Sequence, residues 1–194
     1  IKGLKRIKVN EIYSVGDLID RGPDSEGCIN LCIKYNVKAV MGNHELMYLE
    51  NRRRLENKFK GSDRLHEIMI VHGVAKYNND AIDYIKKLPL FIVKDKIFIC
   101  HAGISQDDFY PLTGEEVIQL YQKRMNDSNG IDKKLIENMD DYILWDKRLI
   151  DKTIDGYFQV YGHTHQKSAI ITSTYTNIDT GCVYKGIGEA KLTA

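Results

Sequence analysis

The chain has 194 residues, of which 43% are hydrophobic and 28% are charged. This length and composition predict one globular domain spanning residues 1–194. The 28 Lys and Arg residues against 27 Asp and Glu leave a formal charge of +1, so charge gives no reason to expect nucleic acid or a membrane as a partner. No apolar run approaches the roughly 18 residues of a membrane span. The four cysteines fit no disulfide framework, so buried reduced thiols and a cytoplasmic location are expected.

The first half of the chain alternates short apolar runs with helical patterns. Residues 12–15 and 37–41 are β-prone, and each run leads into a glycine followed by a polar residue. A helix is expected after each run, the first beyond the turn residues 21–25 and the second from about His44. This alternation predicts an α/β fold with a mostly parallel sheet.

The second half is expected to add helices and then strands. Residues 46–88 have a charged helical pattern, in which the arginine triplet at 52–54 is interpreted as a solvated helix face. Residues 90–93 and 97–100 are β-prone, and Asp95 and Lys96 between them predict a tight hairpin. A helical region is expected from Glu115 to about Arg148, interrupted near residues 127–130. Strands are expected at 157–161, 169–172, 174–178 and 191–193.

Four polar clusters lie at the carboxyl ends of predicted strands. Loops at that edge of an open α/β sheet are where ligands bind. Four of the six histidines fall in these clusters, whereas His66 and His72 lie outside and are interpreted as ordinary surface or core histidines. The clusters are Gly16-Asp17 with Asp20-Arg21-Gly22, Gly42-Asn43-His44-Glu45, His101-Ala102-Gly103, and Gly162-His163-Thr164-His165.

The residue types in these clusters suit a site for two divalent cations. An Asp carboxylate can bridge two cations about 3.5–4 Å apart, and His nitrogens and an amide oxygen can fill the remaining positions. No cluster contains a cysteine, which disfavours a structural zinc site.

The clusters also resemble the motifs of a known family. Gly-Asp-Leu-Ile-Asp-Arg-Gly at 16–22, followed by Gly-Asn-His-Glu at 42–45, resembles the paired signature of the phosphoprotein phosphatase family of calcineurin-like metallophosphoesterases. His-Ala-Gly at 101–103 and Gly-His-Thr at 162–164 match later motifs of the family in order and context. The short length and the continuation Arg-Gly-Pro-Asp-Ser resemble its bacterial and phage branch, which includes the bacteriophage lambda phosphatase and the symmetrical diadenosine tetraphosphate hydrolases. The resemblance covers residues 11–192. It implies two mixed β-sheets flanked by helices, with the metal site at the strand carboxyl ends.

The resemblance implies a centre of two divalent metal ions. Manganese is the first expectation, and iron, zinc or nickel also suit the ligands. Asp17 would bridge the two metals, and Asn43, His101 and His163 would complete the second. A metal-bridging hydroxide would attack phosphorus in line. His165 stands where near relatives usually have proline, and it is expected either to bind the first metal or to lie outside the ligand set.

The resemblance also assigns catalytic and substrate-binding roles. His44 would protonate the leaving-group oxygen, with Asp20 orienting its imidazole. Arg21 would clamp the substrate phosphate with its planar guanidinium, and Asn43 would face the same substrate. Glu45 is expected to be structural and to satisfy backbone groups.

A further substrate contact is expected near the only tryptophan. The family often carries an arginine two residues after this tryptophan, and that arginine touches the substrate. Here that position is Lys147, and Arg148 follows it, so both residues are candidates for substrate binding.

One family motif is absent from the printed sequence. An Asp-x-His-Gly motif is expected some tens of residues before Gly16, yet only fifteen residues precede that glycine. The chain also begins with Ile, so it is expected to start after the natural N-terminus. If these residues were the whole polypeptide, weak or single-metal binding and low turnover would be expected.

Three functions are compatible with these residues. The leading hypothesis is a serine/threonine protein phosphatase, extended to phosphotyrosine by dual specificity. The alternative is symmetrical cleavage of diadenosine tetraphosphate, for which Tyr48, Phe59 and Tyr77 are candidates to stack on a base. A degenerate binding module is the third, disfavoured because the motif residues are present together. A phosphoprotein or small phosphoester is therefore the expected partner, and the sequence does not indicate an oligomeric state.

Overall fold

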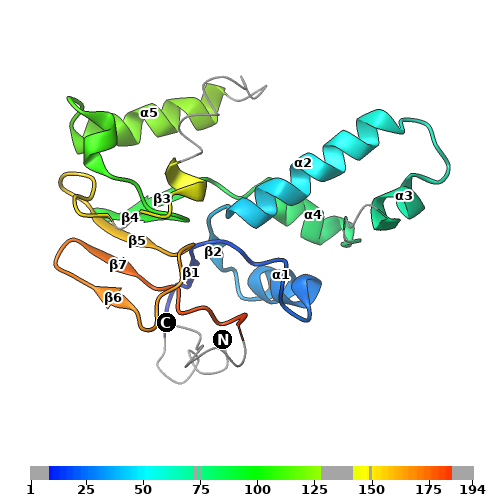
Figure 1. The fold of residues 1–194 in the computed structure, drawn as a ribbon, viewed down its shortest axis with the longest axis horizontal. Helices are drawn as coiled ribbons and strands as arrows, with labels where there is room; N and C mark the ends of the chain where they lie inside the picture. Colours follow the sequence, from blue (N-terminus) through cyan, green and yellow to red (C-terminus); the bar gives the residue numbers. More distant parts are fainter. Residues whose placement is uncertain (1–8, 72–73, 75, 128–141, 149, 185–194) are drawn as a thin grey trace.

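Two β-sheets form the centre of the molecule (Figure 1). The computed structural model describes residues 9–71, 74, 76–127, 142–148 and 150–184. In the smaller sheet, β1 (Tyr13–Ser14) pairs in parallel with β2 (Lys38–Ala39). The larger sheet has the order β3-β4-β5-β7-β6. Its strands are β3 (Phe91–Lys94), β4 (Ile97–Cys100), β5 (Phe158–Tyr161), β6 (Ile170–Ile171) and β7 (Tyr175–Asn177).

The larger sheet is mixed, and its central strands set the position of the site. β4, β5 and β7 are parallel, while β3 and β6 pair antiparallel at the two edges. The carboxyl ends of β4, β5 and β7 therefore lie at one edge of the sheet. Figure 1 shows β1 and β2 beside this edge, so the loops from both sheets meet there.

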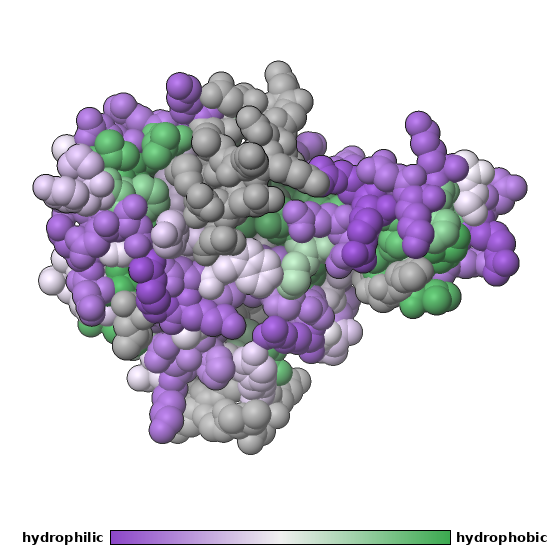
Figure 2. Space-filling view, turned by 45° about the horizontal axis from the view of Figure 1, so that its top comes forward, coloured by the Kyte–Doolittle hydropathy of each residue, from purple (hydrophilic) through white to green (hydrophobic). Residues whose placement is uncertain are grey.

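The helices form two groups on opposite sides of the sheets. α1 (Ser25–Lys34) follows the first strand, and α2 (Asn43–Lys58), α3 (Leu65–Val71) and α4 (Asn79–Lys86) form an arm that projects to one side (Figures 1 and 2). α5 (Gly114–Asp127) lies on the other side, after the short 3₁₀ helix η2 (Gln106–Phe109). No helix in the described part of the chain is both long enough and apolar enough to cross a bilayer.

Each group of helices has its own hydrophobic core. Phe98, Tyr121, Ile143 and Leu144 are fully buried between the larger sheet and α5. Ile29, Leu55 and Ile85 belong to a second buried cluster, which joins α1 to the arm. The elements that carry the site residues are thus held by packing on both sides of the site.

The observed elements follow the predicted order; β3 and β4 have the predicted lengths, and the other described strands are shorter than predicted. The β1–β2 pairing ends at Ser14 and Ala39, because the chain turns out of the sheet at Gly16 (φ 90°) and Asp17 (φ 53°). The hairpin between β3 and β4 is confirmed, since Asp95 and Lys96 both have positive φ, as a tight two-residue turn requires. The strand predicted at 191–193 lies outside the described residues. Within the described residues, helix α5 spans Gly114–Asp127 and a further helical turn covers residues 142–145.

The expectation of four buried thiols was only half right. All four cysteines are free, and Cys32 and Cys100 are buried. Cys28 is only partly buried, and Cys182 is exposed. Cys182 lies in the segment after β7, outside the helices and strands of the described residues.

Candidate metal centre and active site

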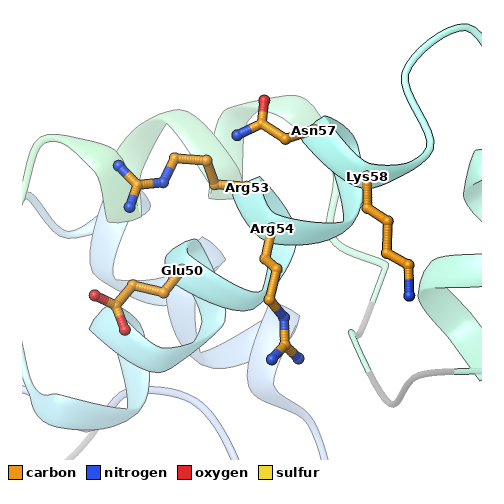
Figure 3. Close-up of a pocket in the computed structure, with 5 residues that line it drawn as sticks. All are labelled: Glu50, Arg53, Arg54, Asn57 and Lys58. Carbon is orange, nitrogen blue, oxygen red and sulfur yellow. The ribbon is translucent and has the colours of Figure 1, made fainter.

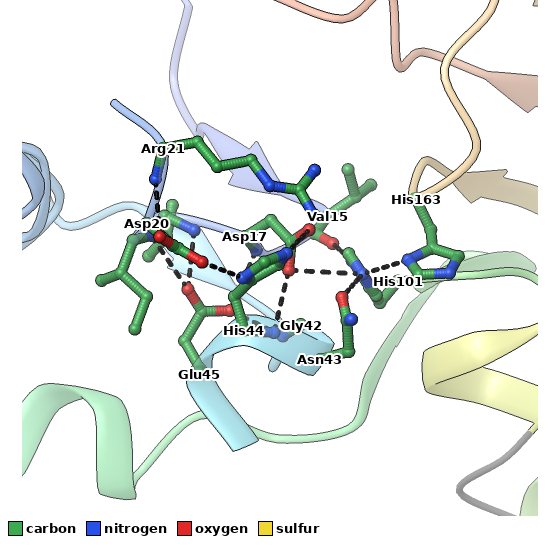
Figure 4. A network of polar contacts seen from close by, with 12 residues as sticks. Val15, Asp17, Asp20, Arg21, Gly42, Asn43, His44, Glu45, His101 and His163 are labelled. Carbon is green, nitrogen blue, oxygen red and sulfur yellow. Dashed lines mark hydrogen bonds and ion pairs between the residues drawn. The ribbon is translucent and has the colours of Figure 1, made fainter. Parts of the chain in front are cut away.

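Four predicted ligand residues meet at the edge where the two sheets come together (Figure 4). Asp17 follows β1, Asn43 begins α2 just after β2, His101 follows β4, and His163 follows β5. The ligand atoms of Asp17, His101 and His163 all lie within 4.8 Å of one another. Residues up to 146 positions apart in sequence therefore form one cluster because parallel strands end at the same edge.

The central residue of this cluster is His101, which is 1% exposed. Its Nδ1 lies 2.7 Å from the carbonyl oxygen of Val15, an acceptor, so Nδ1 carries the proton and Nε2 carries a lone pair. Nε2 lies 3.0 Å from Asn43 Oδ1, 3.1 Å from His163 Nδ1 and 3.4 Å from Asp17 Oδ1. Several lone pairs thus converge on one point, and a divalent cation there would satisfy them together. The residues fit a metal ion.

The protonation states of the two histidines favour the same interpretation. Burial lowers the pKa of His101, although the charge of Asp17 opposes the shift. Burial and the neighbouring His101 lower the pKa of His163 to about 4. Both imidazoles are therefore neutral at pH 7, which is the form that binds metals.

The loop that carries Asp17 is held by one buried carboxylate. Glu45 is fully buried, and its Oε2 accepts hydrogen bonds from the backbone N–H groups of Asp17 (2.9 Å) and Gly42 (2.8 Å). Its Oε1 accepts from the N–H groups of Leu18 (2.7 Å) and Ile19 (3.2 Å). Burial and the charge of Asp17 raise the pKa of Glu45 to about 7, and its backbone donors oppose the rise. The contacts agree with the structural role predicted for Glu45.

Two glycines allow the loops after β1 and β2 to touch. A Cβ atom on Gly16 would lie 2.6 Å from the backbone nitrogen of Gly42, and a Cβ atom on Gly42 would collide with Asp17. Only glycine at both positions lets the loops approach this closely, which places Asp17 beside Asn43.

Backbone strain is concentrated at the same edge. Seven non-glycine residues in the described ranges have positive φ, and four of them are Asp17 (53°), Asp20 (72°), Arg21 (56°) and His163 (69°). Such conformations cost free energy and persist where the surrounding contacts impose them, often at functional sites. The concentration of strained residues at this edge of the sheet is typical of a functional site.

His44 lies between the cluster and Asp20. Its side chain is buried, with Nδ1 2.7 Å from Asp20 Oδ2 and Nε2 3.9 Å from Asp17 Oδ2. Asp20 therefore accepts the Nδ1 proton and orients the ring so that Nε2 faces Asp17. The Asp20 side chain is 58% exposed, so this side of the cluster opens to solvent and to a substrate.

Arg21 and His165 both meet a residue from the far end of the chain. Figure 4 shows the Arg21 side chain extending across the Asp17 side of the cluster. Its Nη1 donates a hydrogen bond of 2.6 Å to the hydroxyl of Tyr184. The ring of His165 packs on the Tyr184 ring at 4.9 Å between centroids. Among the described residues, the group of ligand atoms around His101 does not include His165, whose predicted metal role stays a prediction.

The two candidates after Trp145 differ in their surroundings. Arg148 forms ion pairs with Asp146 (2.5 Å) and Asp108 (2.6 Å), which hold its guanidinium. Lys147 is exposed, and its charge contributes to lowering the pKa of His163, after burial and His101. Of Lys147 and Arg148, Lys147 is thus the one whose charge acts on His163.

The aromatic residues predicted to stack on a base lie in the core. Tyr48 is 7% exposed and its ring packs 4.8 Å from that of Tyr77. Phe59 and Tyr77 pack partly buried against the same cluster. Trp145 is instead 37% exposed, and its ring lies edge-on to His163 at 6.4 Å between centroids. Trp145 therefore presents exposed aromatic surface beside His163.

Sequence reasoning missed Asp179 and Tyr184. Asp179 follows β7 and its charge acts to raise the pKa of His101 against the larger effect of burial. A signal for Asp179 was present, because Asp-Thr-Gly at 179–181 follows a predicted strand just as the four recognised clusters do. No such signal exists for Tyr184, whose contact with Arg21 joins residues 163 positions apart.

A groove on the outer face of α2 lies outside the site (Figure 3). It is about 760 Å³ in volume and is lined by Glu50, Arg53, Arg54, Asn57 and Lys58, which form one exposed stripe of the helix. Arg52 pairs with Glu56 on the same helix at 2.8 Å. None of the predicted site residues lines the groove, and mixed charges at helical spacing agree with a solvated face.

Comparison with known proteins identifies the family. The model of the calcineurin-like phosphoesterases matches residues 1–167. The chain belongs to the calcineurin-like phosphoesterase family. This membership confirms the predicted fold class, an α/β metallophosphoesterase fold, and its assignment to a family of hydrolases that use metals. The narrower bacterial and phage branch stays a prediction.

Several curated relatives are named symmetrical bis(5'-nucleosyl)-tetraphosphatases. The one from Wigglesworthia glossinidia brevipalpis is 29% identical over 149 residues, which cover 74% of this chain and 53% of the relative. The one from Vibrio parahaemolyticus is 31% identical over 108 residues, which cover 53% of this chain and 38% of the relative. The chain spans about half or less of the length of these relatives.

Solved structures share the fold at lower identity. A crystal structure described as a candidate diadenosine tetraphosphatase superposes with a TM-score of 0.62 at 18% identity, covering 94% of this chain and 78% of the other. A cold-active protein tyrosine phosphatase gives a TM-score of 0.55 at 17% identity, covering 94% and 61%. At such identities the likeness concerns the fold alone.

Proposed function

We propose that the chain is the catalytic part of a metal-dependent hydrolase that cleaves dinucleoside tetraphosphates symmetrically. The single observation that carries a hydrolytic role is His44, held by Asp20 at Nδ1 and facing the Asp17, Asn43, His101 and His163 cluster with Nε2. The choice of substrate is supported by the relatives named as symmetrical tetraphosphatases. This choice replaces the protein phosphatase expected from the motifs as the leading hypothesis.

The residues of the chain account for the steps of a hydrolysis. Divalent ions bound at the cluster, with manganese the first to test, would supply an activated water as the nucleophile. Arg21 binds a phosphate oxygen, and Lys147 adds positive charge that acts on His163. Water adds to phosphorus as the bond to the bridging oxygen breaks. In the protonated ring of His44, Asp20 accepts the Nδ1 proton and Nε2 delivers its own proton to that leaving oxygen. Symmetrical cleavage of the central P–O–P bond leaves two nucleoside diphosphates.

Trp145 is the proposed contact for one nucleoside. Its ring is partly exposed and lies beside His163, so a base can stack on it while the phosphates reach the cluster. Tyr48 and Tyr77 are excluded from this role by their packing against each other.

The proposal is tested by assaying two substrates side by side. Manganese-loaded protein is given diadenosine tetraphosphate or a phosphoserine peptide at equal concentration, and the products are separated by chromatography. A ratio of kcat/KM that favours the tetraphosphate and yields ADP supports the proposal. A ratio that favours the peptide, or products of unequal length, contradicts it.

A phosphoprotein is the second candidate substrate. The Asp20 side of the cluster is open, with 58% of that side chain exposed and Arg21 exposed beside it, as a protein substrate requires. A degenerate binding module is disfavoured, because the side chains are assembled at contact distances and not merely present in the sequence.

A further inference from the structure

The segment after β7 returns to the candidate site, where Tyr184 contacts Arg21. Gln166 N–H donates to the carbonyl oxygen of Asp179 (2.8 Å), and Asn177 Nδ2 donates to that of Thr164 (3.0 Å). These bonds tie the segment to the loop that carries His163. A further bond from Tyr184 N–H to the carbonyl oxygen of Gly181 (2.9 Å) closes a turn before Tyr184.

The Tyr184 ring packs closely against residue 181, a position that requires glycine. Gly181 has φ 69°, and a Cβ atom there would lie 3.1 Å from the Tyr184 ring and 3.5 Å from His165. The Tyr184 ring also packs on the His165 ring, at 4.9 Å between ring centroids. Packing therefore fixes the direction of the ring, and with it the position of the hydroxyl.

The Tyr184 hydroxyl contacts the guanidinium of Arg21. It accepts a hydrogen bond from Arg21 Nη1 at 2.6 Å, which uses one of the five N–H donors of the guanidinium. The remaining donors are left for an anion, because no other hydrogen bond of the Arg21 side chain occurs within the described residues. A phenol that accepts in this way keeps its own proton, which can be donated to an oxygen of the same anion.

We infer that Tyr184 is a phosphate-positioning residue, which orients the Arg21 guanidinium and donates its own O–H to the bound phosphate. This inference rests on the proposed function, since it concerns how that site holds its substrate. Tyr184 and Arg21 together form a two-part clamp whose halves come from opposite ends of the described chain. A planar, pre-oriented guanidinium loses less freedom on binding phosphate than a mobile one.

The test uses Tyr184→Phe, which removes the hydroxyl and keeps the ring on His165. The control is Tyr110→Phe, at a tyrosine that is 86% exposed and makes no contact with the cluster. Manganese-loaded proteins are compared in turnover of para-nitrophenyl phosphate and in affinity for inorganic phosphate by calorimetry. We expect Tyr184→Phe to raise KM and the phosphate Kd by about tenfold, with kcat within about twofold of wild type, because a hydrogen bond to a charged group is lost.

A second experiment measures the mobility of the Arg21 guanidinium directly, in the metal-free protein. Nitrogen-15 NMR of the arginine side chains reports rotation about the bonds of the Arg21 guanidinium, and Arg21→Lys identifies its signal. Tyr184→Phe should speed this rotation. In an Arg21→Ala background, Tyr184→Phe should change the phosphate Kd by less than about threefold, because the two residues act as a unit.

The outcomes separate the inference from the proposed function. If wild-type protein hydrolyses no phosphoester but Tyr184→Phe still weakens phosphate binding, the proposed function fails and the clamp stands. If KM and phosphate Kd are unchanged in Tyr184→Phe, or if only kcat falls, the inference is overturned. Absence of phosphate binding by the wild type also overturns it.

Discussion

Replacing Glu45 by Gln tests whether one buried carboxylate builds the site. Each carboxylate oxygen of Glu45 accepts two backbone N–H groups. A glutamine amide can accept two of them through its oxygen, but its NH₂ group faces the other two donors. Two buried donors are then left unsatisfied, at about 1–3 kcal/mol each, and partial solvent access at Asp17 and Leu18 keeps the total near 3 kcal/mol. For a chain of this size, this loss lowers the melting midpoint by about 10 °C.

The assay is urea and thermal unfolding followed by circular dichroism at pH 8, where the carboxylate is ionised because its pKa is about 7. Glu50→Gln is the matched control, since it makes the same chemical change on an exposed position of the same helix. Metal affinity should also fall in Glu45→Gln, because the loop that carries Asp17 loses its anchor. A stability of Glu45→Gln within about 1 kcal/mol of that of Glu50→Gln would refute the reasoning.

Three further predictions follow from the contacts. The pKa of His163 is about 4 in the folded protein and 6.5 in the unfolded chain. As the pH falls below 6.5, His163 therefore takes up a proton in the unfolded chain before it does so in the native state. In the metal-free protein, the stability of wild type relative to that of His163→Gln should therefore fall by about 1 kcal/mol between pH 7 and pH 5 in urea titrations. The raised pKa of Glu45 acts in the opposite direction, but it does so in both proteins and cancels in this comparison. Lys147→Ala should raise KM about tenfold and Arg148→Ala less than threefold, measured by steady-state kinetics; the reverse order would contradict the assignment. Trp145→Ala should lower kcat/KM for diadenosine tetraphosphate about tenfold more than for para-nitrophenyl phosphate, and equal losses would exclude base stacking.

Local sequence patterns were sufficient to predict the elements that position the site. The alternation of apolar runs and helical patterns gave the order of strands and helices, and the turn pair Asp95 and Lys96 gave the hairpin. Polar residues after strands predicted where Asp17, Asn43, His101 and His163 would meet, because parallel strands share one carboxyl edge. The lengths of several strands were overestimated, because hydrophobic periodicity does not show where a glycine with positive φ turns the chain out of a sheet.

Contacts between distant segments could not be predicted in the same way. The bond from Arg21 to Tyr184 and the four donors around Glu45 depend on how loops cross, and no local pattern records this. The exposure of aromatic side chains was equally hard to predict from the sequence. Tyr48 and Tyr77 pack in the hydrophobic cluster that joins the arm to α1, while Trp145 is partly exposed beside His163. Burial is set by the tertiary packing, and so a tyrosine or tryptophan is ambiguous until the fold is known.

The central claim is that His44 acts as an acid beside a metal centre, and one measurement tests it most directly. Turnover of phenyl phosphate, whose leaving group needs a proton, is measured in wild type and His44→Asn with bound metal determined by elemental analysis. The account predicts that chelation abolishes turnover, that manganese restores it, and that His44→Asn keeps its metal but loses about 100-fold or more in kcat. Turnover that survives complete metal removal, or that is unchanged in His44→Asn, would contradict it.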